Sequence, residues 1–231
     1  MRRVRQQLGD ELVGVILAGS YATGEALDVS DVDVAVVCER ELDPVRKRAL
    51  VAALRHDALP GPARKLELAV YRRDVVESPG QTVPFELNLN SGRYEEHVSY
   101  DPAEESPHWF VLDLAIARGQ GRALYGPKPS ELIGEVDPDA VRAALLQALD
   151  WWQRELPDSP NTLLSACRAW RWAEQGDWLS KVAAGEWAMT RSAHPEAIAA
   201  AIERRPLREP VEAALVAAVS DEAREALGRR R

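Results

Sequence analysis

Two carboxylates at alternate positions, Asp31 and Asp33, open an apolar run at residues 32–37, and a Gly-Ser pair, Gly19-Ser20, closes the preceding apolar run. Side chains i and i+2 of a strand point to the same face, so the two carboxylates project together with Cα atoms about 7 Å apart. Neighbouring carboxylates repel one another unless a cation lies between them. Hard oxygen ligands of this kind suit Mg²⁺ that carries the phosphates of a nucleotide.

Two simpler interpretations of the same segment are weaker. A calcium loop at residues 28–33 would need the glycine and the distal glutamate of an EF-hand, and a helix instead of a strand would follow it. A solvated acidic turn before a buried strand is the other alternative, but such a turn does not require Gly19-Ser20 upstream.

The combination of Gly-Ser, its spacing and Asp-x-Asp on a strand resembles the active-site signature of the polymerase-β-like nucleotidyltransferases. This resemblance implies that Asp31 and Asp33 are metal ligands and that a neighbouring strand carries a third carboxylate. Glu67, inside the apolar run 65–71, is the candidate. The alternative for Glu67 is a solvent-facing position on an edge strand.

Composition and charge narrow the class of protein. The 231 residues are 46% hydrophobic and 29% charged, with no apolar run near the length of a membrane span, and we expect no signal peptide. The net charge of −8 argues against a broad nucleic-acid surface and permits a cationic substrate. Cys38 and Cys167 lie in apolar runs, which favours buried thiols in a reducing compartment, so we expect a cytoplasmic protein.

The elements that position these residues indicate an α+β chain. A short basic helix precedes strands at 13–18, 32–38 and 65–71, and a further strand or edge ribbon is expected at 85–90. Asp43 and Pro44 are placed as N-cap and first residue of a helix to about residue 57. Helices are then expected at 108–118, from 141 onward, at 161–174 and 180–191, and as two shorter helices within 195–227.

The change to helix places a domain boundary in the Pro- and Glu-rich segment 101–107. We therefore expect a domain at 1–103, with a small mixed sheet flanked by helices, and an α-helical bundle domain at 104–231.

Several later segments narrow the resemblance. Asn161-Thr-Leu-Leu-Ser-Ala-Cys-Arg168-Ala-Trp170, Ser180-Lys181 and Trp187-Ala-Met189, with Asp113-Leu-Ala-Ile-Ala and Gly126-Pro127 before them, resemble the aminoglycoside (3″)(9) adenylyltransferases in order and spacing. That family joins a nucleotidyltransferase domain to a helical domain, with ATP and antibiotic between them. The resemblance implies Mg²⁺ as cofactor, ATP as co-substrate, and streptomycin or spectinomycin as acceptor.

Carried over by position, the resemblance makes Glu67 the general base and places Gly19, Ser20 and Ser30 at the triphosphate, together with Arg168 and Lys181. The residues themselves agree, because Arg168 and Lys181 are cations on otherwise apolar helices, as a triphosphate needs. The alternative for each is a surface charge whose stem lies over apolar neighbours.

The antibiotic-binding part departs from the family, since the segment before Asn161 is shorter here. Trp152 or its neighbour Trp151 takes the place of the family's tryptophan, although Trp152 also completes an apolar stripe. Asp158 falls at an acidic position of the family. Asp113 is a further acceptor-binding candidate beside Glu67, because a carboxylate on a buried helix needs a partner. No role is assigned to His108 and Trp109.

These observations predict a Mg²⁺-dependent adenylyltransferase, active as a monomer, that acts on a cationic antibiotic without nucleic-acid or membrane partners. A nucleotidyltransferase with another small molecule or a protein as acceptor is one alternative. A non-catalytic, antitoxin-like interaction module is the other, although such a module has no reason to keep repelling carboxylates together.

Overall fold

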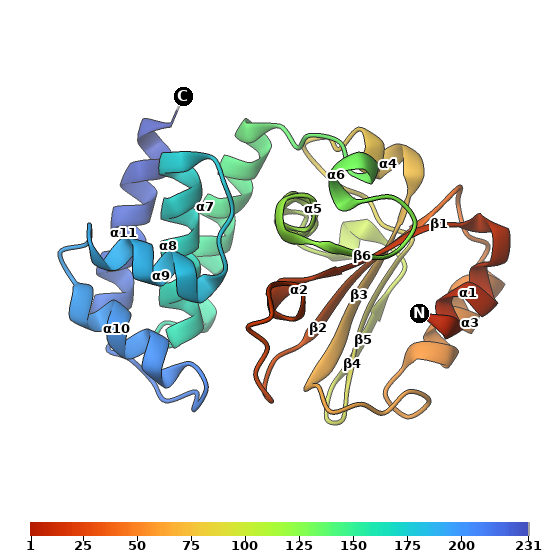
Figure 1. Ribbon diagram of the computed structural model, residues 1–231, viewed down its shortest axis with the longest axis horizontal. Helices are drawn as coiled ribbons and strands as arrows, with labels where there is room; N and C mark the ends of the chain where they lie inside the picture. The colour runs from red at the N-terminus through yellow and green to blue at the C-terminus, as the bar shows by residue number, and fades with distance from the viewer. Residues whose placement is uncertain (231) are drawn as a thin grey trace. The chain divides into compact units, whose positions relative to one another are not determined.

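The computed structural model describes residues 1–230, which form two compact units that divide between Val141 and Arg142 (Figure 1). The first unit contains a small mixed sheet flanked by helices, and the second contains helices without strands among its described residues. The predicted α+β architecture is confirmed. No helix within residues 1–230 is long and apolar enough to cross a membrane.

The sheet of the first unit has six strands in the order β5-β4-β3-β2-β1-β6. Only β2 and β3 run parallel, and every other neighbouring pair is antiparallel. The strands are β1 (Leu12–Ala18), β2 (Val32–Cys38), β3 (Lys65–Arg72), β4 (Leu87–Gly92), β5 (Glu96–Ser99) and β6 (Arg122–Tyr125).

Strand alternation gives this sheet one apolar face. Val36, Leu68 and Leu89 point into a core closed by helices α1 (Arg2–Leu8) and α3 (Pro44–Leu54). The side chains at the alternate positions of these strands, those of Asp33 and Glu67 among them, point to the opposite face because successive side chains of a strand alternate. That second face receives α5 (His108–Gln120) and α2 (Gly19–Thr23) (Figure 1). The remaining short helices of the unit are η1 (Gly9–Glu11), α4 (Arg73–Glu77), η2 (Pro102–Glu104) and α6 (Pro129–Leu132).

Helix α3 begins as the sequence predicts. The Oδ1 atom of Asp43 accepts hydrogen bonds of 2.9 Å from the backbone N–H groups of Val45 and Arg46, and Pro44 occupies the first turn. The predicted N-cap is confirmed. The helix ends at Leu54, a few residues before the predicted end, and turns lead to the Pro-Gly-Pro segment that follows.

The second unit is built around α8 (Pro160–Gln175), which packs against α9 (Lys181–Met189), α10 (Pro195–Arg204) and α11 (Ala213–Arg229). Helix α7 (Pro138–Glu155) is tied to α11 by Arg224, which pairs with Asp150 at 2.9 Å. At its C-terminal end α8 stops at Gly176, which adopts the left-handed conformation at φ +77°.

The chain divides later than the predicted boundary between residues 103 and 104. Helix α5 packs on β1, and β6 pairs with β1 at the edge of the sheet, so residues 108–125 belong to the first unit. Strands β5 and β6 and the short helices α2, α4 and α6 were not expected from the sequence. Strand β4, expected as a strand or edge ribbon, lies inside the sheet because β5 covers it.

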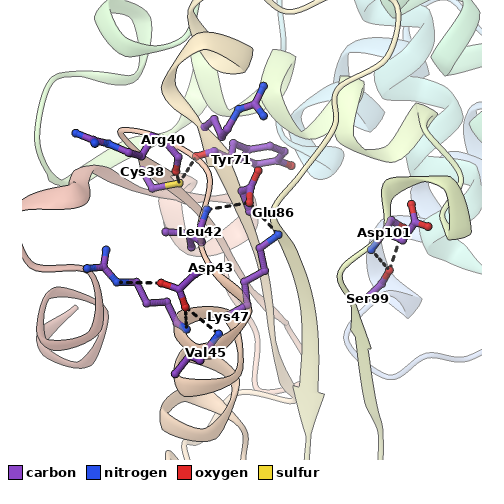
Figure 2. A network of polar contacts seen from close by, with 12 residues as sticks. Cys38, Arg40, Leu42, Asp43, Val45, Lys47, Tyr71, Glu86, Ser99 and Asp101 are labelled. Carbon is purple, nitrogen blue, oxygen red and sulfur yellow. Dashed lines mark hydrogen bonds and ion pairs between the residues drawn. The ribbon is translucent and has the colours of Figure 1, made fainter.

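A buried polar network holds the connection between β2 and α3 (Figure 2). Glu86, 7% exposed, accepts a hydrogen bond of 3.1 Å from the backbone N–H of Leu42 and lies 2.8 Å from the Nζ atom of Lys47. The Cys38 thiol donates to the backbone oxygens of Arg40 and Tyr71 at 3.2 and 3.3 Å. Burial, with the nearby Glu86 carboxylate, raises the pKa of Cys38 to about 12. Cys38 and Cys167 are both buried and free, as predicted.

Replacement of Lys47 by methionine tests this network. Lys47→Met leaves the Glu86 carboxylate buried without its ammonium partner, and we expect the free energy of unfolding to fall by about 3–5 kcal/mol. Chemical denaturation followed by far-ultraviolet circular dichroism measures the change. The double variant Lys47→Met with Glu86→Gln removes both charges and should recover part of the loss. A single variant that unfolds at the same denaturant concentration as the parent contradicts this role for the pair.

Candidate active site

The register of the two parallel strands brings Asp33 and Glu67 side by side. Asp33 of β2 pairs with Glu67 of β3 on one side and with Ala18 of β1 on the other. Adjacent strands lie about 4.8 Å apart, so paired side chains on one face are direct neighbours. The two carboxyl groups are close enough for the Glu67 charge to oppose ionisation of Asp33. Both point to the face opposite the α1 and α3 core, as strand alternation requires.

The charges around Asp33 oppose its ionisation. Desolvation by burial, followed by the charges of Glu67 and Asp113 and a lesser contribution from Asp31, raises the pKa of Asp33 well above its usual value. Asp113 lies exposed on α5, so its negative charge acts on Asp33 from a different element of the fold. The charges of Glu67, Asp113 and Asp31 thus all act on Asp33, and this excess of negative charge on the sheet face favours a cation there.

Gly19 allows the start of α2 to lie directly against Asp33. Its φ of +60° lies in the left-handed region, and a Cβ atom there would lie 1.8 Å from the Oδ2 atom of Asp33. Ser20 follows on α2, which ends at Gly24 with a backbone hydrogen bond to the oxygen of Ser20. Because Gly19 has no side chain, the Gly-Ser pair predicted from the sequence lies directly beside the carboxylate of Asp33.

Asp31 and Ser30 form the entrance to β2. The carboxylate of Asp31 makes a two-point ion pair with Arg64, with 2.6 Å between Arg64 Nε and Asp31 Oδ1. Ser30 is buried, and its Oγ accepts a hydrogen bond of 2.9 Å from the backbone N–H of Leu27. Ser30 therefore holds the loop that precedes the two aspartates.

Two cations and a glutamate that the sequence analysis did not identify complete the cluster. Lys65 Nζ lies 2.8 Å from Glu67 Oε1 and 3.3 Å from Glu95 Oε1, and Arg64 Nη1 lies 3.7 Å from the same Glu95 atom. Burial opposes the charge of Lys65, but the Glu67 carboxylate outweighs it and the pKa of Lys65 is raised. The available signal was the basic pair directly before Leu66-Glu67, since Lys65 and Glu67 are two positions apart and share a face.

The carboxylates of this cluster suit a metal ion that also binds water molecules and substrate phosphates. Within residues 1–230, no three or more His, Cys, Asp or Glu side chains gather as a metal-binding group. Mg²⁺ is commonly held by one or two carboxylates, with substrate phosphates and water completing an octahedron. Asp31 and Asp33, which are hard oxygen donors in a cluster of like charge, fit that requirement.

The predicted residues of the helical part lie in the second unit. Lys181 begins α9, and its Nζ atom lies 6.0 Å from the ring centroid of Trp152 on α7. Arg168 is half-buried on α8, and Asp158 is exposed between α7 and α8. The structure thus brings Lys181 and Trp152 together, and the binding roles of all four residues stay predictions.

His108 and Trp109, which had no assigned role, begin α5. His108 is buried, and its ring centroid lies 4.4 Å from that of Trp109.

The close approach at Gly19 can be tested against a second left-handed glycine. Gly24 has φ +80° and no atom within 4 Å of an added Cβ, so Gly24→Ala measures backbone strain alone, about 1–2 kcal/mol. Gly19→Ala adds the collision with Asp33 and should lower the free energy of unfolding by at least about 1 kcal/mol more. Equal losses in the two variants, measured by chemical denaturation, contradict the contact.

The raised pKa of Asp33 predicts how stability depends on pH. The folded chain keeps the Asp33 proton to higher pH than the unfolded chain, so the Asp33 contribution lowers the free energy of unfolding as pH rises from about 4 through the folded-state pKa. Asp33→Asn removes this contribution. We expect the variant to match the parent at acidic pH and to be more stable at neutral pH, as measured by denaturation over a pH series without added metal. A variant that is less stable than the parent at pH 7 contradicts the repulsive cluster.

Comparison with known proteins assigns both units. A nucleotidyltransferase domain model matches residues 1–86, and the model for the C-terminal domain of aminoglycoside adenylyltransferases matches residues 131–221. A spectinomycin 9-adenylyltransferase of Staphylococcus aureus is 29% identical over 205 residues, which are 82% of this chain and 75% of that protein. A Methanocaldococcus jannaschii protein, provisionally named a protein adenylyltransferase, is 35% identical over 92 residues, 39% of this chain and 55% of its own length.

A solved structure agrees in fold. The spectinomycin adenyltransferase AAD(9) from Enterococcus faecialis, crystallised with ATP and spectinomycin, superposes with a TM-score of 0.69 at 18% identity, covering 99% of this chain and 95% of that chain. With a nucleotidyltransferase domain followed by this particular helical domain, the chain is a nucleotidyltransferase whose two matched segments are those of the aminoglycoside adenylyltransferases.

Proposed function

We propose that the chain transfers AMP from ATP to a hydroxyl group of an aminoglycoside-type antibiotic, with spectinomycin as the first candidate, and releases pyrophosphate. The observation that carries the reaction is the pairing of Asp33 with Glu67 in register, beside the close approach of Gly19. The acceptor class is supported by the similarity to spectinomycin 9-adenylyltransferase along most of the chain.

The reaction needs a base for the attacking hydroxyl. The acceptor oxygen attacks the α-phosphorus of ATP, the bond from that phosphorus to the bridging oxygen breaks, and pyrophosphate leaves with the electron pair. Glu67 takes the hydroxyl proton. Its side chain is 38% exposed, so an acceptor can reach it, and the Lys65 contact at 2.8 Å orients the carboxylate. Glu67 is therefore the residue on this face best placed to act as general base.

Asp31 and Asp33 would hold Mg²⁺, which would neutralise phosphate charge. The Arg64 guanidinium contacts both carboxylate oxygens of Asp31, so it would have to release Asp31 before that carboxylate could hold a metal ion. A released Arg64 keeps Glu95 as a partner.

Gly19, Ser20 and Ser30 contact the triphosphate from the first domain, as the family relationship suggests. Arg168 and Lys181 supply positive charge to the triphosphate from the second domain.

The acceptor is cationic. Asp113 is exposed on α5 close enough to raise the pKa of Asp33, so an ammonium group beside it gains from the whole carboxylate cluster. Trp152 and Asp158 are the acceptor contacts proposed in the second domain. We further propose that the enzyme works as a cytoplasmic monomer.

Two alternatives make different predictions. The Methanocaldococcus jannaschii relative favours a protein as acceptor, in which case pyrophosphate appears with a protein substrate and with none of the antibiotics. A non-catalytic module would release no pyrophosphate with any acceptor. The second alternative is disfavoured by the cluster itself, because a raised pKa at Asp33 means that the fold carries an electrostatic cost that a passive module does not need.

Pyrophosphate release with a panel of acceptors tests the proposal. With ATP and Mg²⁺ we expect release with spectinomycin or streptomycin, and spectinomycin is the stronger candidate because the streptomycin-binding segment is altered. Glu67→Gln should lower the rate by about 10²–10⁴ while ATP affinity is kept. Glu77→Gln, which changes an exposed glutamate of α4, is the matched control and should be fully active. If ATP binds but no antibiotic in the panel releases pyrophosphate, the aminoglycoside assignment is wrong.

A further inference from the structure

The line of paired residues through Asp33 and Glu67 continues across the sheet toward its edge. Glu67 pairs with Asn90 of β4, and Asn90 pairs with His97 of β5. Residues paired across neighbouring strands point to the same face, so Asn90 and His97 share the face of the catalytic carboxylates. The opposite face of the same two strands carries Leu89 and Val98, which belong to the core under α3.

Hydrogen bonds order these side chains into one row. Asn90 Nδ2 donates to Asn88 Oδ1 at 3.3 Å, and Asn88 Nδ2 donates to Glu105 Oε1 at 3.3 Å. His97 Nε2 pairs with the same oxygen of Glu105. We name Asn88, Asn90, His97 and Glu105 the edge row. Its members are linked to one another, so their polar groups are held in place before any ligand arrives.

The edge row has a composition that sheet stability does not explain. Asparagine is among the residues depleted in strands, yet two asparagines occupy alternate positions of β4, an interior strand. Asn88 is only 9% exposed, and Glu105 has a side chain 17% exposed. His97, by contrast, is 57% exposed and makes the row reachable from solvent. Polar groups that are ordered, linked and open at one end are suited to bind a polar ligand.

The order of strands indicates which substrate the edge row would face. Gly19 and the two aspartates lie on the side of β1 and β2, and Glu67 of β3 lies between them and the edge row. In an in-line displacement the attacking hydroxyl and the leaving pyrophosphate occupy opposite sides of the α-phosphorus. Because Glu67 must touch the attacking hydroxyl, the acceptor extends from Glu67 away from β2, which is the direction of Asn90 and His97.

We propose that the edge row is the part of the acceptor site that recognises hydroxyl and ammonium groups of the substrate. The inference rests on the proposed function, since it assigns the direction of the acceptor from the role of Glu67. The amides of Asn88 and Asn90 bind hydroxyl groups, and the Glu105 carboxylate attracts a cationic amine. The ligand class is a hydroxylated ring compound that carries positive charge.

Substitutions along the row separate this role from catalysis and from folding. We would measure spectinomycin binding by calorimetry in the presence of Mg²⁺ and a non-hydrolysable ATP analogue, and KM and kcat from pyrophosphate release. Glu105→Gln should weaken spectinomycin binding and raise its KM about tenfold or more, the size of a lost charge-assisted contact. Asn90→Ala should do the same by about two- to tenfold, the size of a lost neutral hydrogen bond. Affinity for the ATP analogue should stay within about twofold, which also reports that the variants are folded.

Glu96→Gln is the matched control. Glu96 lies on β5 next to His97 but points to the opposite face, where it pairs with Arg55 at 2.6 Å. We expect this variant to bind spectinomycin as the parent does. His97→Gln changes the most exposed member of the row and serves where Asn90→Ala does not fold.

The results distinguish failure of this inference from failure of the proposed function. If the parent binds and modifies spectinomycin and the row variants do so with unchanged affinity and KM, the edge row is not the acceptor subsite and the proposed function stands. If the parent binds no aminoglycoside with Mg²⁺ and the ATP analogue present, the proposed function falls and this inference falls with it.

Discussion

Repulsion between neighbouring carboxylates is the constraint on which the first unit depends. The parallel register of β2 and β3 fixes Asp33 beside Glu67, and the burial of Asp33 limits the screening of its charge by water. The same strands bury Val36 and Leu68 on the other face, so the sheet core holds the pair in place against its own repulsion. A fold that keeps such charges together without relaxing is prepared for a cation, and the energy is recovered when one binds.

Two cations, Lys65 at the start of β3 and Arg64 directly before it, offset this repulsion at different carboxylates. Lys65 neutralises and orients Glu67 from the same strand, whereas Arg64 engages Asp31 at the entrance to β2. Glu95 contacts both cations from the turn between β4 and β5, so the edge of the sheet is electrostatically linked to the carboxylates. One face of the sheet thus carries the apolar core, and the other carries the carboxylate cluster together with a polar edge on β4 and β5.

Local sequence patterns predicted most of the helices and strands, but they did not predict contacts between residues far apart in the sequence. The i, i+2 spacing of Asp31 and Asp33, the carboxylate inside the third strand and the N-cap at Asp43 depend on a few neighbouring residues, and each element lies where it was expected. The ion pair of Arg64 with Asp31 depends on strand register, which a single sequence does not specify. The two units divide after residue 141, and the sequence did not indicate this for two reasons. Helix α5 is apolar nearly all round, a pattern shared by helices of bundles and helices that cover sheets. Strand β6 is too short to show alternation.

The binding of ATP with and without Mg²⁺ tests most directly whether the carboxylate cluster is built for a metal-bound nucleotide. Calorimetric titration of ATP would be compared in excess Mg²⁺ and in a chelating buffer. Without the cation, the triphosphate adds negative charge beside Asp33 and Glu67, so we expect ATP affinity to be at least about tenfold weaker, which corresponds to about 1.4 kcal/mol. Equal affinity in the two buffers would contradict the assignment of this cluster as the site that receives the metal and the phosphates.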